Sequence, residues 1–239
     1  MKKVLVLDFG GQYNLLVARR VRECGVYCEI KSFRLSMDEI RAFGPDALIL
    51  TGGPATVFEP NAPMVDKALF EMGIPVLGIC YGQQLMMQLL GGQCRRAETR
   101  EYGKVQLTHT ASPLFADVPE TSVCWMSHGV EVERLAPGFA VVATTEGCGF
   151  AAVANDSRRL YGVQFHPEVL HTEYGTQVLQ NFLYRVCGFG PEWTMASYLE
   201  DAVDECRRKS GDRRVLQALT CGVDRTVAAA LLQRAGGDQ

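Results

Sequence analysis

Residues 76–84 read VLGICYGQQ, and this stretch decides the fold and indicates the chemistry. A short apolar strand ends at Cys80, which lies between Gly78 and Gly82, and a helical pattern begins immediately afterwards. A sharp strand-to-helix turn of this kind lifts a side chain clear of the sheet. It also places the thiol at a helix N-terminus, where the helix dipole favours the thiolate. The stretch therefore predicts an α/β sheet with a cysteine nucleophile at its edge.

The strand-and-helix pattern extends through the first hundred residues. Short apolar runs predict buried strands at 4–7, 26–30, 47–51 and 76–79. Helical spacing predicts helices around 15–21, from a capping box at 36–39, at 63–72 and at 84–90. Strands that alternate with helices in this way form a parallel sheet covered on both faces.

The pattern changes after residue 100, where strands follow one another closely. We expect strands at 105–108, 122–125, 139–144, 149–154 and 160–164, with a turn at 155–157 and a closing helix at 172–186. Residues 1–189 are therefore predicted to form one α/β domain whose second half is rich in strands.

Residues 190–239 have a separate organisation. Residues 188–191 read GFGP and predict a linker. Beyond it we expect an amphipathic helix at 195–209, with Leu199, Val203 and Cys206 on one face, then a strand at 215–220 and a helix at 227–235. Because one strand and two helices bury little core by themselves, we expect this helix-strand-helix fragment to be the incomplete N-terminal piece of a second domain.

Composition and charge exclude several classes of protein. Of the 239 residues, 47% are hydrophobic, which supports a substantial core, and a net charge of −3 without a basic stripe argues against nucleic-acid binding. We see no secretory segment and no apolar run of the roughly 18 residues that a membrane helix needs. The nine cysteines include no CxxC and no Cys/His cluster at zinc spacing, so we expect no metal site. We expect a cytoplasmic protein with reduced thiols, most of them in the core.

Candidate partners for Cys80 lie far downstream, where residues 164–168 read QFHPE. His166 follows an expected strand, and Glu168 comes two residues later, close enough to reach the imidazole and select its tautomer. A cysteine, a histidine and an orienting carboxylate make a nucleophilic triad. Each residue also has a plainer interpretation: Cys80 as an inert core thiol, His166 as a turn histidine, and Glu168 as a solvated charge.

The Gly52-Gly53-Pro54 run after the strand at 47–51 also has two interpretations. It is a turn, or it is an oxyanion hole, since glycines let backbone N–H groups approach a developing negative charge. We favour the second, because neighbouring parallel strands open their loops at the same sheet edge, where such sheets bind ligands.

Five motifs of this chain match one family pattern: DFGGQY at 8–13, TGGP at 51–54, GICYGQQ at 78–84, WMSHG at 125–129 and GVQFHPEV at 162–169. In combination they make residues 1–189 resemble the class I (triad) glutamine amidotransferase domain of the GMP synthetase family. The resemblance implies an open, mostly parallel, flavodoxin-like sheet with helices on both faces. Residues 191–239 resemble the start of that family's ATP pyrophosphatase domain, with Trp193-Thr194-Met195 opening its first helix.

The resemblance implies a catalytic role for three residues. Cys80 attacks the side-chain amide of glutamine. His166 protonates the leaving ammonia and then activates water against the glutamyl thioester. Glu168 orients His166.

Other motif residues are implied to hold the oxyanion and the substrate. The oxyanion lies between the backbone N–H groups of Gly53 and Tyr81, and the glutamine is positioned by Gln84, Ser127 and His128. The family usually carries Asp after the SHG motif, whereas this chain has Val130. The missing carboxylate is expected to weaken recognition of the glutamine amino group, or coupling between domains.

The nucleotide loop of the second domain departs further from the family. The family's loop reads SGGVDS, so that backbone N–H groups and a small hydroxyl surround pyrophosphate. Here residues 220–226 read TCGVDRT. Cys221 adds a side chain where a glycine allows close approach, and Arg225 replaces a hydroxyl with a bulky cation. We therefore expect a degenerate loop at Thr220, Cys221, Gly222, Asp224, Arg225 and Thr226.

These motifs lead to competing functional hypotheses. The first is hydrolysis of glutamine, with ammonia passing to a separate or missing synthetase domain that uses ATP and Mg²⁺ to convert XMP to GMP. It predicts no cofactor in this chain and no GMP synthesis by it alone. The alternatives are a partner-dependent or regulatory amidotransferase subunit with little activity alone, and a cysteine-dependent hydrolase of other γ-glutamyl substrates. A homo-oligomer stays open.

Overall fold

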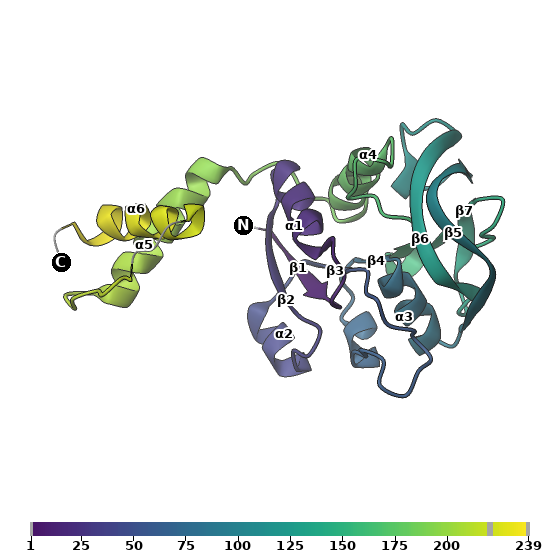
Figure 1. The fold of residues 1–239 in the computed structure, drawn as a ribbon, viewed down its shortest axis with the longest axis horizontal. Helices are drawn as coiled ribbons and strands as arrows, with labels where there is room; N and C mark the ends of the chain where they lie inside the picture. The colour runs from purple at the N-terminus through teal and green to yellow at the C-terminus, as the bar shows by residue number, and fades with distance from the viewer. Residues whose placement is uncertain (1, 219–221, 238–239) are drawn as a thin grey trace. The chain divides into compact units, whose positions relative to one another are not determined.

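One mixed sheet forms the framework of the unit that ends at Pro191, within residues 2–218 and 222–237, which this computed structural model describes. Its nine strands in this range are β1 (Lys3–Asp8), β2 (Tyr27–Ser32), β3 (Ala47–Leu50), β4 (Val76–Ile79), β5 (Gln93–His109), β6 (Thr121–Arg134), β7 (Ala140–Thr144), β8 (Ala152–Asn155) and β9 (Leu160–Val163). They lie in the order β2-β1-β3-β4-β9-β8-β7-β5-β6 (Figure 1).

The sheet is parallel on one side and antiparallel on the other. The neighbours from β2 to β9 pair in parallel, and those from β9 to β6 pair antiparallel. The expected α/β class and the change of pattern after residue 100 are thus confirmed. The expected turn at 155–157 is confirmed as well, since a 3₁₀ turn at Asp156–Arg158 joins the antiparallel pair β8 and β9.

Helices cover both faces of the parallel part. Helix α1 (Asn14–Glu23), helix α4 (Gly175–Gln180) and the π-helical turn that continues it (Asn181–Val186) pack on one face. Helices α2 (Met37–Phe43) and α3 (Tyr81–Leu89) pack on the other (Figure 1). Alternate residues of the central strands feed the two cores; in β1, Val4 and Val6 face one and Leu5 and Leu7 the other. Continuous apolar strands are what a sheet buried on both faces requires.

Local signals place several element ends. The Ser36 hydroxyl accepts from the Glu39 N–H and the Glu39 carboxylate accepts from the Ser36 N–H, so the expected capping box is confirmed at the start of α2. Gly44 ends that helix with a left-handed conformation, as glycine readily does. Strand β4 has the expected bounds, and α3 begins directly after Cys80.

The helix expected at 63–72 is wrong for its first half. The structure has only a 3₁₀ helix at Lys67–Glu71, whose first turn is capped by the Asp66 carboxylate. Upstream, the Pro63 carbonyl accepts a 2.6 Å hydrogen bond from the Tyr81 hydroxyl. This tertiary contact holds the chain in a nonhelical path that apolar spacing does not reveal.

Strands β5 and β6 are much longer than the runs expected at 105–108 and 122–125. They form a two-stranded ribbon, and much of β6 alternates between buried and more exposed residues. A search for apolar runs underestimates such strands, because their solvent-facing positions are polar. The strand expected at 149–154 begins later, at Ala152.

The residues from Glu192 onward form a second unit. It contains α5 (Met195–Ser210) and α6 (Val223–Gly236), which pack on each other, and the Arg207 guanidinium donates to the Arg234 and Ala235 carbonyls at the end of α6. Val203 is buried, as the amphipathic pattern predicts. Helix α6 begins four residues before its expected start. The strand expected at 215–220 is not formed at 215–218, and its last two residues lie outside the described part of the chain.

Cysteines and helices fit the class that composition indicates. Of the eight cysteines in the described residues, six are buried and none forms a disulfide. Burial raises the pKa of the Cys28 thiol to about 11 and that of Cys148 to about 12, so both stay protonated at neutral pH. Within residues 2–218 and 222–237, no helix has both the length and the apolar character needed to cross a bilayer.

Replacing Gly82 by alanine should destabilise the first unit by about 3 kcal/mol, at the upper end of overpacking effects. A Cβ atom at Gly82 would lie 2.4 Å from the Leu50 carbonyl oxygen, so backbone must move to admit it. The free energy of unfolding in urea measures this. Gly149→Ala is the matched control, because a Cβ there meets no atom within 4 Å. An unchanged midpoint for Gly82→Ala would contradict the tight elbow packing.

Candidate active site

Four loops meet at the carboxyl edge of the parallel strands. They follow β1, β3, β4 and β9, which are adjacent in the sheet, and they carry residues 9–13, 51–54, 80–81 and 164–168. This edge is where open α/β sheets bind ligands. The topology therefore brings together motifs that lie up to 155 residues apart in the sequence, between positions 11 and 166.

Cys80 occupies a strained position between β4 and α3. Its backbone has φ 52 and ψ −105, a left-handed φ that non-glycine residues rarely adopt. The Cys80 N–H donates a 2.7 Å hydrogen bond to the Val163 carbonyl of β9, which holds the turn in place. A Cβ at Gly78 would lie 2.6 Å from backbone atoms of Gly82, so the turn needs glycines on both sides. Strain of this type is characteristic of a nucleophile elbow.

His166 and Glu168 form the second part of the site. The distance from His166 Nδ1 to Glu168 Oε1 is 2.7 Å, and both side chains are buried. The loop is fixed through its backbone: the His166 N–H donates to the Trp125 carbonyl at 3.0 Å, and the Arg20 guanidinium donates to the Glu168 carbonyl at 3.0 Å. A carboxylate on Nδ1 leaves Nε2 as the nitrogen that can exchange a proton at the reacting atoms.

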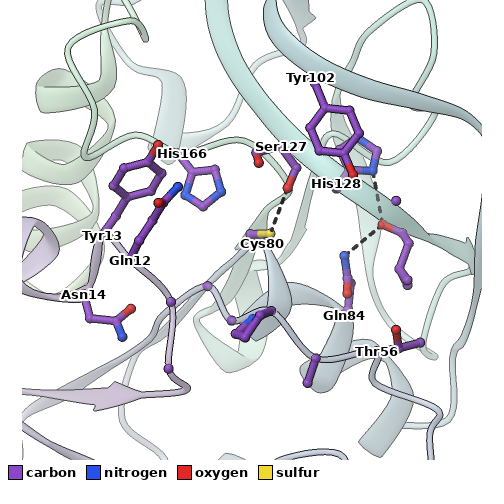
Figure 2. A pocket seen from close by; sticks show the side chains of 18 of the residues that line it. Gln12, Tyr13, Asn14, Thr56, Cys80, Gln84, Tyr102, Ser127, His128 and His166 are labelled. Carbon is purple, nitrogen blue, oxygen red and sulfur yellow. Dashed lines mark hydrogen bonds between the residues drawn. The ribbon is translucent and has the colours of Figure 1, made fainter.

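Gly52 lies where His166 and Cys80 approach each other. A Cβ at Gly52 would be 3.1 Å from His166 Cε1 and 3.6 Å from Cys80 Cβ, so a larger residue would crowd both. Figure 2 shows His166 and Tyr13 on one side of Cys80, with His128 and Gln84 on the other. The Tyr13 ring meets the imidazole edge-on, with the ring centroids 5.3 Å apart. Nucleophile, imidazole and carboxylate are thus assembled in one place.

The protonation of His166 is set by opposing effects. Burial disfavours the charged imidazole, but its hydrogen bonds with Cys80 and Glu168 outweigh burial and raise the pKa of His166 to about 10. At neutral pH the ring is therefore an imidazolium. A positive ring beside the sulfur stabilises negative charge there, and it can deliver a proton to a leaving group.

A pocket of about 590 Å³ opens above Cys80. This volume lies in the range typical of small-molecule sites. Its lining includes the residues that the sequence marks for catalysis, oxyanion binding and substrate binding: Cys80, His166, Glu168, Gly53, Gln84, Ser127 and His128. The Tyr81 side chain points elsewhere, with its hydroxyl on the Pro63 carbonyl, so only the Tyr81 backbone can serve the site. The Tyr81 N–H lies in the first turn of α3, where helix amides lack intrahelical acceptors.

The expected substrate residues are held by a hydrogen-bonded network that includes Val130. The Val130 carbonyl accepts from Gln84 Nε2 at 2.9 Å and lies 3.1 Å from His128 Nδ1. Gln84 Nε2 also lies 3.0 Å from Gln164 Oε1. The Ser127 carbonyl oxygen is 4.0 Å from Cys80 Sγ. At position 130 it is thus the backbone that ties two pocket residues together.

A buried trio beside the pocket has the donor types of a metal site. Glu101, His128 and Cys148 each place a ligand atom within 4.8 Å of the others. The Glu101 carboxylate accepts from the Thr145 hydroxyl at 2.9 Å and from the Gly147 N–H at 3.2 Å, and it lies 3.3 Å from His128 Nε2. Hydrogen bonds within the protein therefore satisfy this carboxylate.

The residues expected in the nucleotide loop belong to the second unit. Gly222, Asp224, Arg225 and Thr226 lie at the start of α6, whereas Thr220 and Cys221 fall outside the described residues. The Thr226 hydroxyl donates to the Gly222 carbonyl at 3.0 Å, and Gln217 Nε2 donates to the Arg225 carbonyl at 3.2 Å. These contacts are internal to the segment.

Several residues of the site escape sequence reasoning. Tyr13 belongs to a recognised motif but carries no predicted role. The Thr172 hydroxyl donates to the His166 carbonyl at 2.7 Å and accepts from the Trp125 N–H at 3.0 Å, which braces the histidine loop. Arg100 and Tyr102 also line the pocket. Both lie within a long strand, in a run at 100–103 that reads REYG and carries no motif that would single them out.

Comparisons with known sequences agree with this geometry. The family model for glutamine amidotransferase class-I matches residues 5–186. A GMP synthase [glutamine-hydrolyzing] from Agathobacter rectalis is 54% identical over 239 residues, which are 100% of this chain and 46% of that protein. One from Acetivibrio thermocellus is 53% identical over 237 residues, 99% of this chain and 46% of that protein. The chain spans about half the length of the curated relatives it matches.

Solved structures show the same fold. A Thermoplasma acidophilum protein, provisionally described as one of the subunits of a GMP synthase, superposes with a TM-score of 0.72 at 31% identity, over 84% of this chain and 97% of that one. A glutamine amidotransferase from Thermotoga maritima has a TM-score of 0.63 at 19% identity, over 79% of this chain and 99% of that one. The second likeness concerns the fold alone.

Proposed function

The chain belongs to the class I glutamine amidotransferase family, and on that basis we propose that it hydrolyses the side-chain amide of glutamine to glutamate and ammonia. The observation that carries the proposal is the strained Cys80 elbow beside His166, whose Nδ1 is held by Glu168 at 2.7 Å. Nucleophile, acid–base group and orienting carboxylate are the elements of acyl transfer through a covalent intermediate.

In the first half-reaction, the Cys80 sulfur attacks the amide carbon of glutamine. Negative charge develops on the amide oxygen, between the backbone N–H groups of Gly53 and Tyr81. The carbon–nitrogen bond then breaks, and His166 gives its proton to the departing ammonia. The product is a glutamyl thioester on Cys80 and a neutral imidazole.

In the second half-reaction, His166 takes a proton from water as the water oxygen attacks the thioester carbon. The carbon–sulfur bond breaks, glutamate leaves, and the imidazolium beside the sulfur is restored. Glu168 keeps the ring in one orientation throughout. We assign positioning of the glutamine to Gln84, Ser127 and His128, because each lines the pocket.

We further propose that the ammonia serves the amination of XMP to GMP by a synthetase domain that binds ATP and Mg²⁺. The support is the similarity to GMP synthases at 53% and 54% identity. The second unit would then be the amino-terminal piece of that synthetase domain. The free thiols favour the cytoplasmic setting expected from the sequence.

A partner-dependent protein is the second candidate. The Thermoplasma acidophilum relative is described as one of several subunits, and 97% of its length is matched, which favours an amidotransferase that works with a separate synthetase chain. Under this alternative, the chain hydrolyses glutamine slowly until the synthetase docks.

The purified chain is expected to release glutamate and ammonia from glutamine in equal amounts, and to make no GMP from XMP and ATP by itself. Adding a synthetase domain from a GMP synthase should restore GMP formation. Coupled assays for glutamate, ammonia and GMP measure all three. If glutamine stays intact both with and without the synthetase domain, the proposed hydrolysis is wrong. A rate that rises more than tenfold on adding the domain would favour the partner-dependent protein.

A further inference from the structure

An irregularity in β5 lies beside the pocket. In the β5–β6 ribbon, Arg96 pairs with Val130 and Glu101 pairs with His128, so the residues at 97–100 face Gly129 alone. Such a bulge re-aims side chains and is common next to active sites. Arg100 is the last residue of this bulge.

The bulge directs Arg100 over the pocket. Arg100 lines it, and its Nε and Cδ atoms lie 3.7 and 3.9 Å from the place a Cβ of Gly129 would take. The Tyr102 hydroxyl lies 3.6 Å from the same point. The missing side chain at Gly129 thus leaves space for Arg100, two residues along the strand from Ser127.

Glu101 gives the bulge a fixed base. Its carboxylate is buried and held by Thr145, Gly147 and His128. A Cβ at Gly147 would lie 2.7 Å from Glu101 Oε1, so the pocket for this carboxylate is closely fitted. Because Glu101 is anchored, the backbone that carries Arg100 is anchored too.

The charges of the pocket leave Arg100 available for an anion. Among the described lining residues the guanidinium groups are Arg96 and Arg100, and the carboxylate is Glu168, which is engaged with His166. Arg96 forms an ion pair with Glu59 at 3.5 Å, whereas Arg100 pairs with no carboxylate in the described residues. A guanidinium at the rim is matched by its planar fork of donors to a carboxylate.

We propose that Arg100 binds the α-carboxylate of glutamine and so determines which amides the site accepts. The proposal rests on the proposed function and deepens it: the substrate class is an amide with a free carboxylate at the far end of a short chain. Cys80 takes the amide end of this substrate, and Arg100 takes the acid end. Arg100 acts on binding, not on the bond that breaks.

Three amides separate this role from a general effect on the pocket. They are glutamine, its analogue without the amino group (5-amino-5-oxopentanoate), and its analogue without the carboxylate (4-aminobutanamide). Arg100→Ala should raise KM for the two carboxylate-bearing amides about 10- to 100-fold, the loss of a charge-assisted hydrogen-bonded pair, while kcat stays within about threefold. For 4-aminobutanamide, kcat/KM should be unchanged.

Controls decide between charge and structure. Lys104→Ala removes a cation from the same strand outside the pocket and should leave all three substrates unaffected. Arg100→Lys should recover part of the lost affinity. An Arg100→Ala protein with an unchanged KM for glutamine would overturn the proposal, and so would an equal loss on 4-aminobutanamide.

A binding measurement keeps this inference separate from the proposed reaction. Calorimetry with glutamine compares Cys80→Ala with the Cys80→Ala, Arg100→Ala double variant, and it requires no turnover. We expect Kd to rise about 10- to 100-fold in the double variant. An equal Kd in the two proteins refutes the role of Arg100, whereas a wild-type chain that binds glutamine through Arg100 without hydrolysing it refutes only the proposed reaction.

Discussion

Cys80→Ala is expected to lower kcat/KM for glutamine hydrolysis by about 10⁴-fold or more, the usual cost of removing the nucleophile from a triad. Alanine cannot form the thioester, and the imidazole and oxyanion donors that remain have no covalent intermediate to act on. The variant should keep its fold, because alanine fits the space of cysteine and the elbow is held by Gly78, Gly82 and the bond to Val163. Steady-state release of glutamate measures the loss.

A matched variant separates this effect from the loss of any thiol. Cys206→Ala removes a partly exposed thiol from α5 and should retain full activity. Glutamine binding should survive in Cys80→Ala, since the side chains that line the rest of the pocket are unchanged. Hydrolysis by Cys80→Ala within about tenfold of the wild-type rate would exclude Cys80 as the nucleophile.

Glu168→Gln is expected to lower kcat by about 10²- to 10⁴-fold, as happens when the orienting carboxylate of a triad becomes an amide. The glutamine side chain can present an N–H to Nδ1 and so select the wrong tautomer. It also removes the negative charge that faces the imidazolium at 2.7 Å. The rate should therefore fall even though the shape of the site is kept.

The same substitution should change the pH dependence. The pKa of His166 is raised to about 10, so the imidazolium persists from acid through neutral pH and is lost as the pH rises through about 10. Stability contributed by this charge follows the same sign: it is fully present below the unfolded value of about 6.5 and disappears as the pH passes about 10. Glu168 is one of the causes of the raised pKa, so removing its charge lowers the pKa of His166.

The pH profile of kcat/KM reports this shift. Its alkaline limb, which belongs to the Cys80–His166 pair, should lie near pH 10 in the wild type and at lower pH in Glu168→Gln. Glu200→Gln in α5 is the control and should leave the limb in place. An alkaline limb at the same pH in wild type and Glu168→Gln would show that Glu168 does not set the charge of His166.

The parallel half of the fold could be predicted from the sequence because its physics is local. Strands buried on both faces are continuous apolar runs, so β1, β3 and β4 were found close to their true bounds. The elbow was predictable for a related reason, since the glycines around Cys80 serve a turn with a specific backbone conformation.

The ribbon of β5 and β6 could not be predicted in full. Its strands alternate in burial, and their pairing contains a bulge whose register is set by contacts between distant residues. Arg100 reaches the pocket only because of that bulge, and Glu101 is buried only because residues 145–147 fold over it. The strand expected at 215–218 failed for the opposite reason: local propensity was present, but no neighbouring strand pairs with it in the described residues.

The candidate site shows the same division. Motif residues at the ends of adjacent parallel strands were expected to converge, and the structure places them around one pocket. The braces that hold them depend on contacts across the fold, such as Thr172 with His166 and Arg20 with Glu168. Such contacts join segments that carry no common pattern in the sequence.

The central claim is that glutamine passes through a covalent intermediate on Cys80. Wild-type protein is mixed with saturating glutamine, quenched in acid during turnover and analysed by peptide mass spectrometry. We predict a glutamyl adduct on the peptide that contains Cys80, and its absence from the Cys80→Ala protein. A glutamyl group on a different residue, or ammonia release that continues at the wild-type rate in Cys80→Ala, would contradict the account.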